Sequence, residues 1–205
     1  MPAEESNLAD KSRKEYVGRV EPIPTLQGSR ELSYTAELTR SMSMLADHPK
    51  TLFIGQSTRY DGQAMHKTFS GVPMDRRIEF PVAEDFQMGF CTGLALEGYI
   101  PVCCYPRMDF LLLAANQLVN HLDKLSVMSK GKWSPHVIIR TAVGSTSPLN
   151  PGPQHIQDHS NAFMDMTTSI FVNKLLGSKL INYHYQKALK TPGVHLMVEY
   201  MGMYD

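Results

Sequence analysis

The residues that decide the fold run Ile78-Glu79-Phe80-Pro81-Val82-Ala83-Glu84 and continue from Asp85 to Gly98. The first part is a short apolar run and predicts a buried strand over Ile78–Val82. The second part predicts a helix over Asp85–Glu97 that is rich in small residues. Glu84 stands at the junction, at the carboxyl end of a strand, where open α/β sheets place their functional groups. It is therefore either a catalytic carboxyl group or, like Asp85, a cap for the first amides of the helix.

Strands and helices alternate on both sides of this stretch. Ser33 is expected to cap a helix over Tyr34–Ala46, and a short buried strand over Thr51–Ile54 ends at Gly55. The other expected elements are strands over Ile100–Tyr105, His136–Thr141 and Val194–Glu199, a helix over about Asp109–Val127, short helices near Ser160–Met166 and Tyr185–Leu189, and a long loop over Val143–Ser160. This alternation predicts an α/β fold with a doubly wound, mostly parallel sheet and helices on both faces. We expect one domain over residues 31–205, and a polar tail over residues 1–30 that is flexible or docks on a partner.

The composition limits the class of protein. With 205 residues, of which 42% are hydrophobic, the chain can bury one good core. Twenty basic and twenty acidic side chains balance, so nucleic acid is not an expected partner. The longest apolar runs, such as Phe110–Ala115, are far too short to span a bilayer, and the N-terminus lacks the apolar segment of a secretory signal. We expect a cytoplasmic protein without membrane contact, whose three cysteines are reduced thiols.

The chain resembles the β subunit of 2-oxo acid dehydrogenase E1 components. The similarity begins in Pro81-Val82-Ala83-Glu84 and runs through Leu94–Val102. It continues at Phe110, Asn116–Asn120, Lys124, Met128–Gly131, Val137–Arg140, Gln154-His155 and Val198–Tyr200. The order and spacing of these pieces are more specific than any one of them. The resemblance implies the pyrimidine-binding domain of a thiamine-diphosphate enzyme of the transketolase-like superfamily.

This resemblance implies a cofactor site around Glu84. In that family the Glu at this position hydrogen-bonds N1′ of the aminopyrimidine and stabilises the imino form that takes the proton from the thiazolium C2. Phe110 would stack on the pyrimidine, with Met108 on the same surface, although core packing would also explain Phe110. His155 would handle protons or contact the acceptor, or is a solvated loop histidine. Zinc is not expected, because His155 and His159 have no evident third ligand.

Three further residues are candidates for contact with the substrate. Arg107 could bind a carboxylate or phosphate bidentately, or pair with an acidic group on a partner chain. Gln56 stands where E1 β chains carry an acidic residue, which puts the role of that acid at the active-site entrance in doubt. Gln154 is the first member of the Gln-His pair. No residue of this chain is expected to bind metal.

The chain lacks the pattern that anchors the diphosphate in this superfamily. That pattern is Gly-Asp-Gly followed further along by Asn-Asn; neither occurs here, and Tyr60-Asp61-Gly62 is the nearest match. Because Mg²⁺ requires hard oxygen ligands beside the phosphates, we expect an α-type partner chain to hold Mg²⁺ and the diphosphate. Thiamine diphosphate would then be shared, most simply in an α₂β₂ hetero-oligomer. The chain ends at Asp205, where an E1 β subunit would enter a second, C-terminal transketolase-type domain, so that domain is expected to be absent.

The expected function is that of a pyrimidine-binding subunit, active only with its partner, in an enzyme that decarboxylates a 2-oxo acid and transfers the acyl or aldehyde unit. A dehydrogenase of this kind would hand its acyl group to a lipoyl-bearing acyltransferase. The alternatives are a carboligase or non-oxidative decarboxylase of the same superfamily, and a non-catalytic assembly or regulatory subunit that retains the fold. A generic doubly wound small-molecule binder is also open, although no G-x-G-x-x-G or P-loop occurs.

Overall fold

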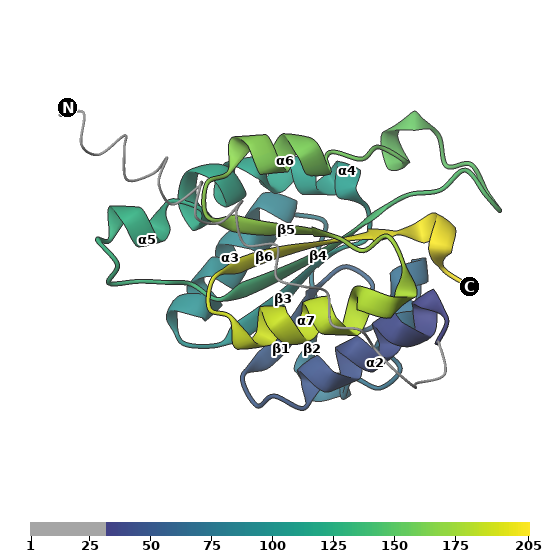
Figure 1. Cartoon of the computed structure of the whole chain (residues 1–205), viewed down its shortest axis with the longest axis horizontal. Helices are drawn as coiled ribbons and strands as arrows, with labels where there is room; N and C mark the ends of the chain where they lie inside the picture. Colours follow the sequence, from purple (N-terminus) through teal and green to yellow (C-terminus); the bar gives the residue numbers. More distant parts are fainter. Residues whose placement is uncertain (1–31) are drawn as a thin grey trace. The chain divides into compact units, whose positions relative to one another are not determined.

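The computed structural model describes residues 32–205, which form one six-stranded sheet with helices on both faces (Figure 1). The strands are β1 (Thr51–Gly55), β2 (Arg77–Glu79), β3 (Ile100–Tyr105), β4 (Val137–Val143), β5 (Ile170–Lys174) and β6 (Val194–Tyr200). They lie in the order β2-β1-β3-β4-β6-β5, and every neighbouring pair is parallel. The predicted α/β class is confirmed, with a sheet that is parallel throughout. The proposed tail, residues 1–30, lies outside the described residues.

Helices cover the two faces of the sheet in separate groups (Figure 1). On one face α2 (Tyr34–Ala46) and α7 (Ile181–Lys190) pack into one hydrophobic cluster. On the other face α3 (Glu84–Leu96), α4 (Met108–Leu111) and α6 (Ser160–Met166) pack into a second cluster. The central strands β3 and β4 are buried at every position, as expected for strands covered on both faces.

The first helix follows its local sequence signals. α2 has the predicted bounds, and the Ser33 hydroxyl accepts a hydrogen bond from the Ala36 N–H at 3.3 Å. The side chains of Leu38, Met42 and Leu45, spaced at helical intervals, are fully buried. Capping and periodicity therefore suffice to define this element.

The strand that leads to Glu84 is shorter than predicted. β2 ends at Glu79, and the expected extension to Val82 is wrong. The Phe80 N–H still donates to the carbonyl of Gly55 at 3.1 Å, but Pro81 has no N–H with which to continue the ladder. Val82 is exposed, and α3 begins one residue earlier than predicted, at Glu84 itself.

The predicted continuous helix over Asp109–Val127 is wrong. The segment consists of α4, a 3₁₀ turn (Leu112–Ala114), a π-helical turn (Gln117–Leu122) and α5 (Leu125–Met128). The changes in pitch keep a row of apolar side chains, Leu111, Ala114, Leu118 and Leu122, buried against the sheet. Leu112 and Leu113 are exposed, so the apolar run is not deeply buried within this domain.

Local sequence signals do not predict β5. This strand lies at the edge of the sheet, pairs only with β6, and is half-buried at all five positions, so it lacks a clear burial pattern. A distant residue fixes its start: the Asp123 carboxylate accepts hydrogen bonds from the Thr168 and Ser169 N–H groups at 3.0 and 2.7 Å. Tertiary contacts therefore define this strand.

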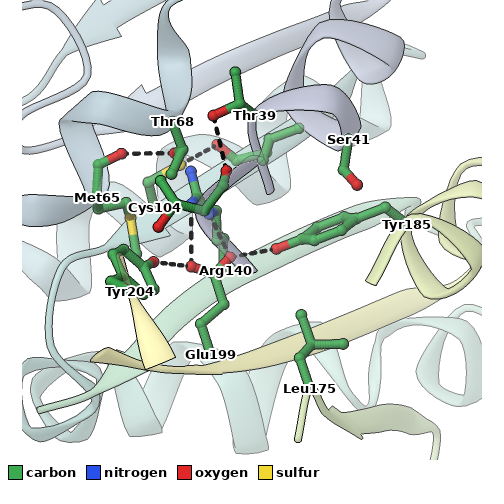
Figure 2. A network of polar contacts seen from close by, with 12 residues as sticks. Thr39, Ser41, Met65, Thr68, Cys104, Arg140, Leu175, Tyr185, Glu199 and Tyr204 are labelled. Atoms are coloured by element: carbon green, nitrogen blue, oxygen red, sulfur yellow. Dashed lines mark hydrogen bonds and ion pairs between the residues drawn. The ribbon is translucent and has the colours of Figure 1, made fainter. Parts of the chain in front are cut away.

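A buried ion pair joins β4 to β6 beneath α2 and α7 (Figure 2). Arg140 binds Glu199 through two contacts, Nε to Oε1 at 2.5 Å and Nη2 to Oε2 at 3.0 Å, and both side chains are fully buried. The hydroxyl groups of Tyr185 and Tyr204 also donate to the Glu199 carboxylate. Burial and the nearby negative charge of Glu199 raise the pKa of Tyr185 and Tyr204, so both hydroxyl groups stay protonated.

The described residues also bear on membrane spanning and on the state of the cysteines. Within residues 32–205, no helix combines the length and the apolar character needed to cross a membrane. Cys91, Cys103 and Cys104 are all buried free thiols.

Candidate functional site

The order of the strands marks the position of the site. β1 has β2 on one side and β3 on the other, so the sheet reverses its winding at this point. Ligands of open α/β sheets bind at such a switch point, beyond the carboxyl ends of the strands. Gln56 follows β1, Glu84 opens the helix after β2, and Arg107 follows β3. The fold therefore brings three of the predicted site residues to the same edge of the sheet.

Glu84 is the first residue of α3, and its exposed fraction is only 5%. Its Oε1 accepts a hydrogen bond from Gln56 Nε2 at 3.2 Å. The cap position belongs to Ala83, and the neighbouring Asp85 carboxylate accepts a hydrogen bond from Gln117. Neither acidic side chain serves as the helix cap, which leaves the buried carboxylate of Glu84 available to a ligand.

Two buried side chains fix the first turn of α3 on β3. The Tyr105 hydroxyl donates to the Glu84 carbonyl at 3.0 Å, and Gln87 Nε2 donates to the Cys104 carbonyl at 3.0 Å. Burial raises the pKa of Tyr105 well above its usual value, so the hydroxyl remains a donor. Neither residue is singled out by the sequence analysis; the signal is a polar side chain at an apolar position.

A third unpredicted residue, Glu79, holds the loop that carries Gln56. Its carboxylate accepts hydrogen bonds from the N–H groups of Ser57 and Arg59, both at 2.7 Å. Just before Gln56, the backbone of Gly55 passes so close to β3 that an added Cβ would lie 2.2 Å from the Cys104 carbonyl oxygen. Only glycine fits there without displacing β3.

Phe110 and His155 come from distant parts of the chain and meet at the site. Their rings lie edge to face, with centroids 5.5 Å apart and an interplanar angle of 89°. Phe110 lies in α4 and His155 in a 3₁₀ turn (Pro153–His155) of the long loop after β4, and both are half-buried. Gln154, in the same turn, is exposed. The expected stacking residue and the expected catalytic histidine are therefore direct neighbours.

Met108 was expected to lie on the same surface as Phe110, and this expectation is wrong. Its side chain is fully buried in the cluster beneath α3, and its sulfur accepts a hydrogen bond from the His159 N–H at 3.2 Å. Met108 lies two residues before Phe110 on α4, a spacing that places the two side chains on opposite faces of the helix, and Met108 points toward the sheet. Met108 thus holds the loop against α4 from within the core.

Several buried polar atoms at this joint have no hydrogen-bond partner among the described residues. They are Arg107 Nε, Asp109 Oδ2, His155 Nδ1 and His159 Nε2. The two segments that carry them are in contact, because Gln157 Nε2 donates to Asp109 Oδ1 at 2.9 Å. Burial lowers the pKa of Arg107 from its usual value, with Tyr204 and Asp109 acting in the opposite direction. Unpartnered buried polar groups of this kind fit a site that binds a polar ligand.

Among residues 32–205, no three His, Cys, Asp or Glu side chains are grouped so that they could hold a metal ion. The donor set at the switch point is instead a carboxylate, an aromatic face, an imidazole and a guanidinium. This set fits an organic cofactor with a flat basic ring: Glu84 for a ring nitrogen and Phe110 for the ring face.

Comparisons with known proteins find relatives over part of the chain. No protein-family model matches the chain. It is 31% identical over 121 residues to the pyruvate dehydrogenase E1 component subunit beta of Staurastrum punctulatum, covering 58% of this chain and 36% of the relative. The same subunit of Gracilaria tenuistipitata var. liui is 35% identical over 82 residues, covering 40% and 25%. The chain thus spans about a quarter to a third of the length of these relatives.

Solved structures show the same fold. A split-gene transketolase, described as an inactive β₄ tetramer, superposes with a TM-score of 0.65 at 16% identity, covering 83% of this chain and 52% of that one. The described residues therefore have the α/β fold of a transketolase-like domain. The chain is a distant, partial homologue of the β subunits of pyruvate dehydrogenase E1.

Proposed function

We propose that this chain is the pyrimidine-binding subunit of a split thiamine-diphosphate enzyme that decarboxylates a 2-oxo acid. The observation that supports this most directly is the buried Glu84 carboxylate, held by Gln56 at the switch point of the sheet. When bound, thiamine diphosphate would supply the electron sink for decarboxylation. An α-type partner chain would hold the diphosphate and Mg²⁺, and the cofactor would lie between the two subunits.

The residues of this chain would have distinct roles in that reaction. Glu84 would hold a proton at N1′ of the pyrimidine, and Phe110 would supply an apolar face that orients the ring. His155, against the Phe110 ring, has an unpartnered Nδ1 that could hold or release a proton near the reacting end. Arg107, with its unpartnered Nε, would bind the carboxylate of the substrate. Gln154 and Gln56 would complete the entrance to the active site and the contact with thiamine diphosphate.

A carboligase or non-oxidative decarboxylase is the second candidate within the same class. Arg107 favours it, because the guanidinium, half-buried and short of partners, suits a substrate that keeps a carboxylate or phosphate group after decarboxylation. A dehydrogenase would instead pass its acyl group to a lipoyl-bearing acyltransferase. Activity of the purified complex with lipoamide as acceptor separates the two candidates.

Assembly with a partner is supported by an exposed aromatic cluster on α3. Phe86 and Phe90 are 63% and 36% exposed, and both pack against Phe80 with ring centroids about 5.5 Å apart. Monomeric proteins rarely leave such apolar groups uncovered. We propose that a subunit interface, most simply in an α₂β₂ hetero-oligomer in the cytoplasm, covers this cluster.

Cofactor binding tests the proposal. Titration calorimetry with thiamine diphosphate and Mg²⁺ should show little or no binding to this chain alone, and clear binding once the co-purifying partner is added. That partner should carry Gly-Asp-Gly and Asn-Asn. Metal-dependent binding of micromolar affinity or better by the isolated chain would contradict the split site, and no binding by the complex would contradict the proposed cofactor.

A further inference from the structure

A cavity lies at the edge of the sheet opposite the candidate site. It has a volume of about 450 Å³, within the range of small-molecule sites. Its lining comes from the residues at or just before the amino ends of β1, β3, β4 and β6: His48, Pro49, Lys50, Ala95, Gly98, Tyr99, Ile100, Ser134, His136 and Pro192. The residues assigned to cofactor and substrate lie beyond the carboxyl ends of the strands, so this cavity is a separate site.

The charged groups of the lining are basic. Lys50, His48 and His136 line the cavity, and no acidic residue does. The Lys50 ammonium has no hydrogen bond or ion pair with any side chain or backbone group of residues 32–205; its Nζ lies 3.7 Å from the point where a Cβ on Gly98 would stand. Gly98 has a φ of +83°, a conformation that disfavours a side chain there. The exposed Lys50 side chain therefore lines the cavity without an ion-pair partner among residues 32–205.

The two histidines can add hydrogen bonds to a bound anion. The Lys50 N–H donates to His48 Nδ1 at 3.3 Å, which places the proton of a neutral His48 ring on Nε2. His136 Nε2 lies 2.7 Å from the Ala188 carbonyl oxygen and therefore donates to it. An oxyanion in the cavity would accept hydrogen bonds from the Nε2–H of His48 and from the ammonium of Lys50.

The remaining walls are apolar. Ala95, Tyr99 and Ile100 belong to the lining, together with Pro49 and Pro192. Such walls suit a compact hydrocarbon body attached to the anionic group, with Ser134 as an additional hydroxyl partner. A cation or a fully polar sugar would not match this set.

We propose that this cavity binds a small organic oxyanion, a phosphate or carboxylate on a short apolar body, at a second site remote from the cofactor site. This inference does not depend on the proposed enzymatic function. It depends on the basic lining, the unpaired Lys50 and the volume of the cavity.

Titration of the full chain with phenyl phosphate, followed by NMR of the histidine imidazole signals, tests the site. His48 and His136 should shift together and saturate, and benzoate should shift the same signals if the carboxylate is recognised equally. Lys50→Gln should weaken binding about tenfold or more, the size expected for one charge-assisted contact. Lys67→Gln, at an exposed lysine on another element, is the matched control and should leave affinity unchanged.

Three outcomes would overturn the site. The first is the absence of saturation at His48 and His136 with either anion. The second is equal loss of affinity in Lys50→Gln and Lys67→Gln, which would indicate diffuse charge attraction. The third is equally tight binding of benzylamine, which has the apolar body but the opposite charge.

Discussion

Gln56 donates a hydrogen bond to Glu84 across the switch point of the sheet, with 3.2 Å between Nε2 and Oε1. The two residues are joined through different strands: Gln56 follows β1, and Glu84 follows β2. An amide at the position of Gln56 supplies a donor where an acid would add a second negative charge. The Gln56 amide therefore holds the Glu84 carboxylate by a hydrogen bond without adding charge to the site.

Replacement of Gln56 by Glu should destabilise the protein at neutral pH. Two carboxylates in direct contact repel each other, and protonation of one of them relieves the repulsion. The loss of thermal stability in Gln56→Glu should therefore be larger at pH 7.5 than at pH 5. Gln56→Met, which removes the donor without adding charge, is the control and should show no such dependence on pH. An equal loss at both pH values in Gln56→Glu would mean that the two groups are not in contact.

Glu84→Gln should reduce the turnover of the reconstituted complex by about two orders of magnitude or more, because an amide cannot hold the proton that the pyrimidine requires. The fold should be kept, since the two side chains have the same shape. Asp85→Asn is the control on the adjacent residue and should retain activity. Steady-state kinetics and circular dichroism of both variants make the comparison. Nearly unchanged turnover in Glu84→Gln would remove its catalytic role.

Glu199→Gln should lower the free energy of unfolding by about 3–5 kcal/mol, because it leaves the buried Arg140 without its counter-charge. Arg140 and Glu199 are both fully buried, so water cannot compensate. The double variant Arg140→Met, Glu199→Leu removes both charges and should be clearly more stable than Glu199→Gln. Urea denaturation of the variants tests the coupling. A double variant that is no more stable than Glu199→Gln would show that the two charges do not depend on each other.

Stability should fall as the pH falls below 6.5, in part because of His195. Burial lowers its pKa to about 4, with nearby His136 and Lys187 acting in the same direction against the hydrogen bond to Thr191. The unfolded histidine has a pKa of about 6.5 and takes up its proton first, so the stabilising contribution is complete above pH 6.5 and is lost toward pH 4. The difference between the pKa of His195 in the folded and unfolded states corresponds to about 3 kcal/mol of unfolding free energy at most.

Unfolding in urea at pH 7.5 and pH 4.5 measures this contribution. The difference in the free energy of unfolding between the two pH values should be smaller in His195→Gln than in the wild type, because the variant has no imidazole to protonate. His121→Gln, at an exposed histidine, is the control and should behave like the wild type. The same pH dependence in His195→Gln and the wild type would assign the effect to other groups.

Substitution of both Phe86 and Phe90 by Ser should weaken assembly with the partner chain without unfolding the domain. Neither ring is among the buried residues of the core, whereas an interface would bury both of them. Light scattering on mixtures with the partner should show a loss of the larger species. Tyr60→Ser, at an exposed aromatic residue in another region, is the control. Unchanged assembly of the double Phe variant would place the interface elsewhere.

Local patterns in the sequence define many elements of this fold. Ser33 and the apolar spacing after it give α2, and the uninterrupted apolar run Ile100–Tyr105 gives β3, both with the predicted bounds. Glu84 is placed between a strand and a helix for the same reason: strand, turn and helix signals follow each other within a few residues, and α3 begins at Glu84 itself. Such short-range signals act through backbone preferences and burial period, which are readable without knowledge of distant contacts.

The remaining features depend on contacts between distant residues. β5 is an edge strand whose start is held by Asp123, and the π-helical turn at Gln117–Leu122 adapts a helix to the surface of the sheet. Neither is encoded by a local repeat. The burial of Met108 likewise depends on which way a short helix faces the core.

The sequence by itself determined the alternation of strands and helices and the position of Glu84. Only the tertiary structure decided that Gln56 contacts Glu84, that Phe110 meets His155, and that Glu79 holds the loop after β1. The physical reason is that each of these contacts joins segments far apart in the chain. Their meeting is fixed by the order of the parallel strands and by the packing of helices on the sheet, which no single segment specifies.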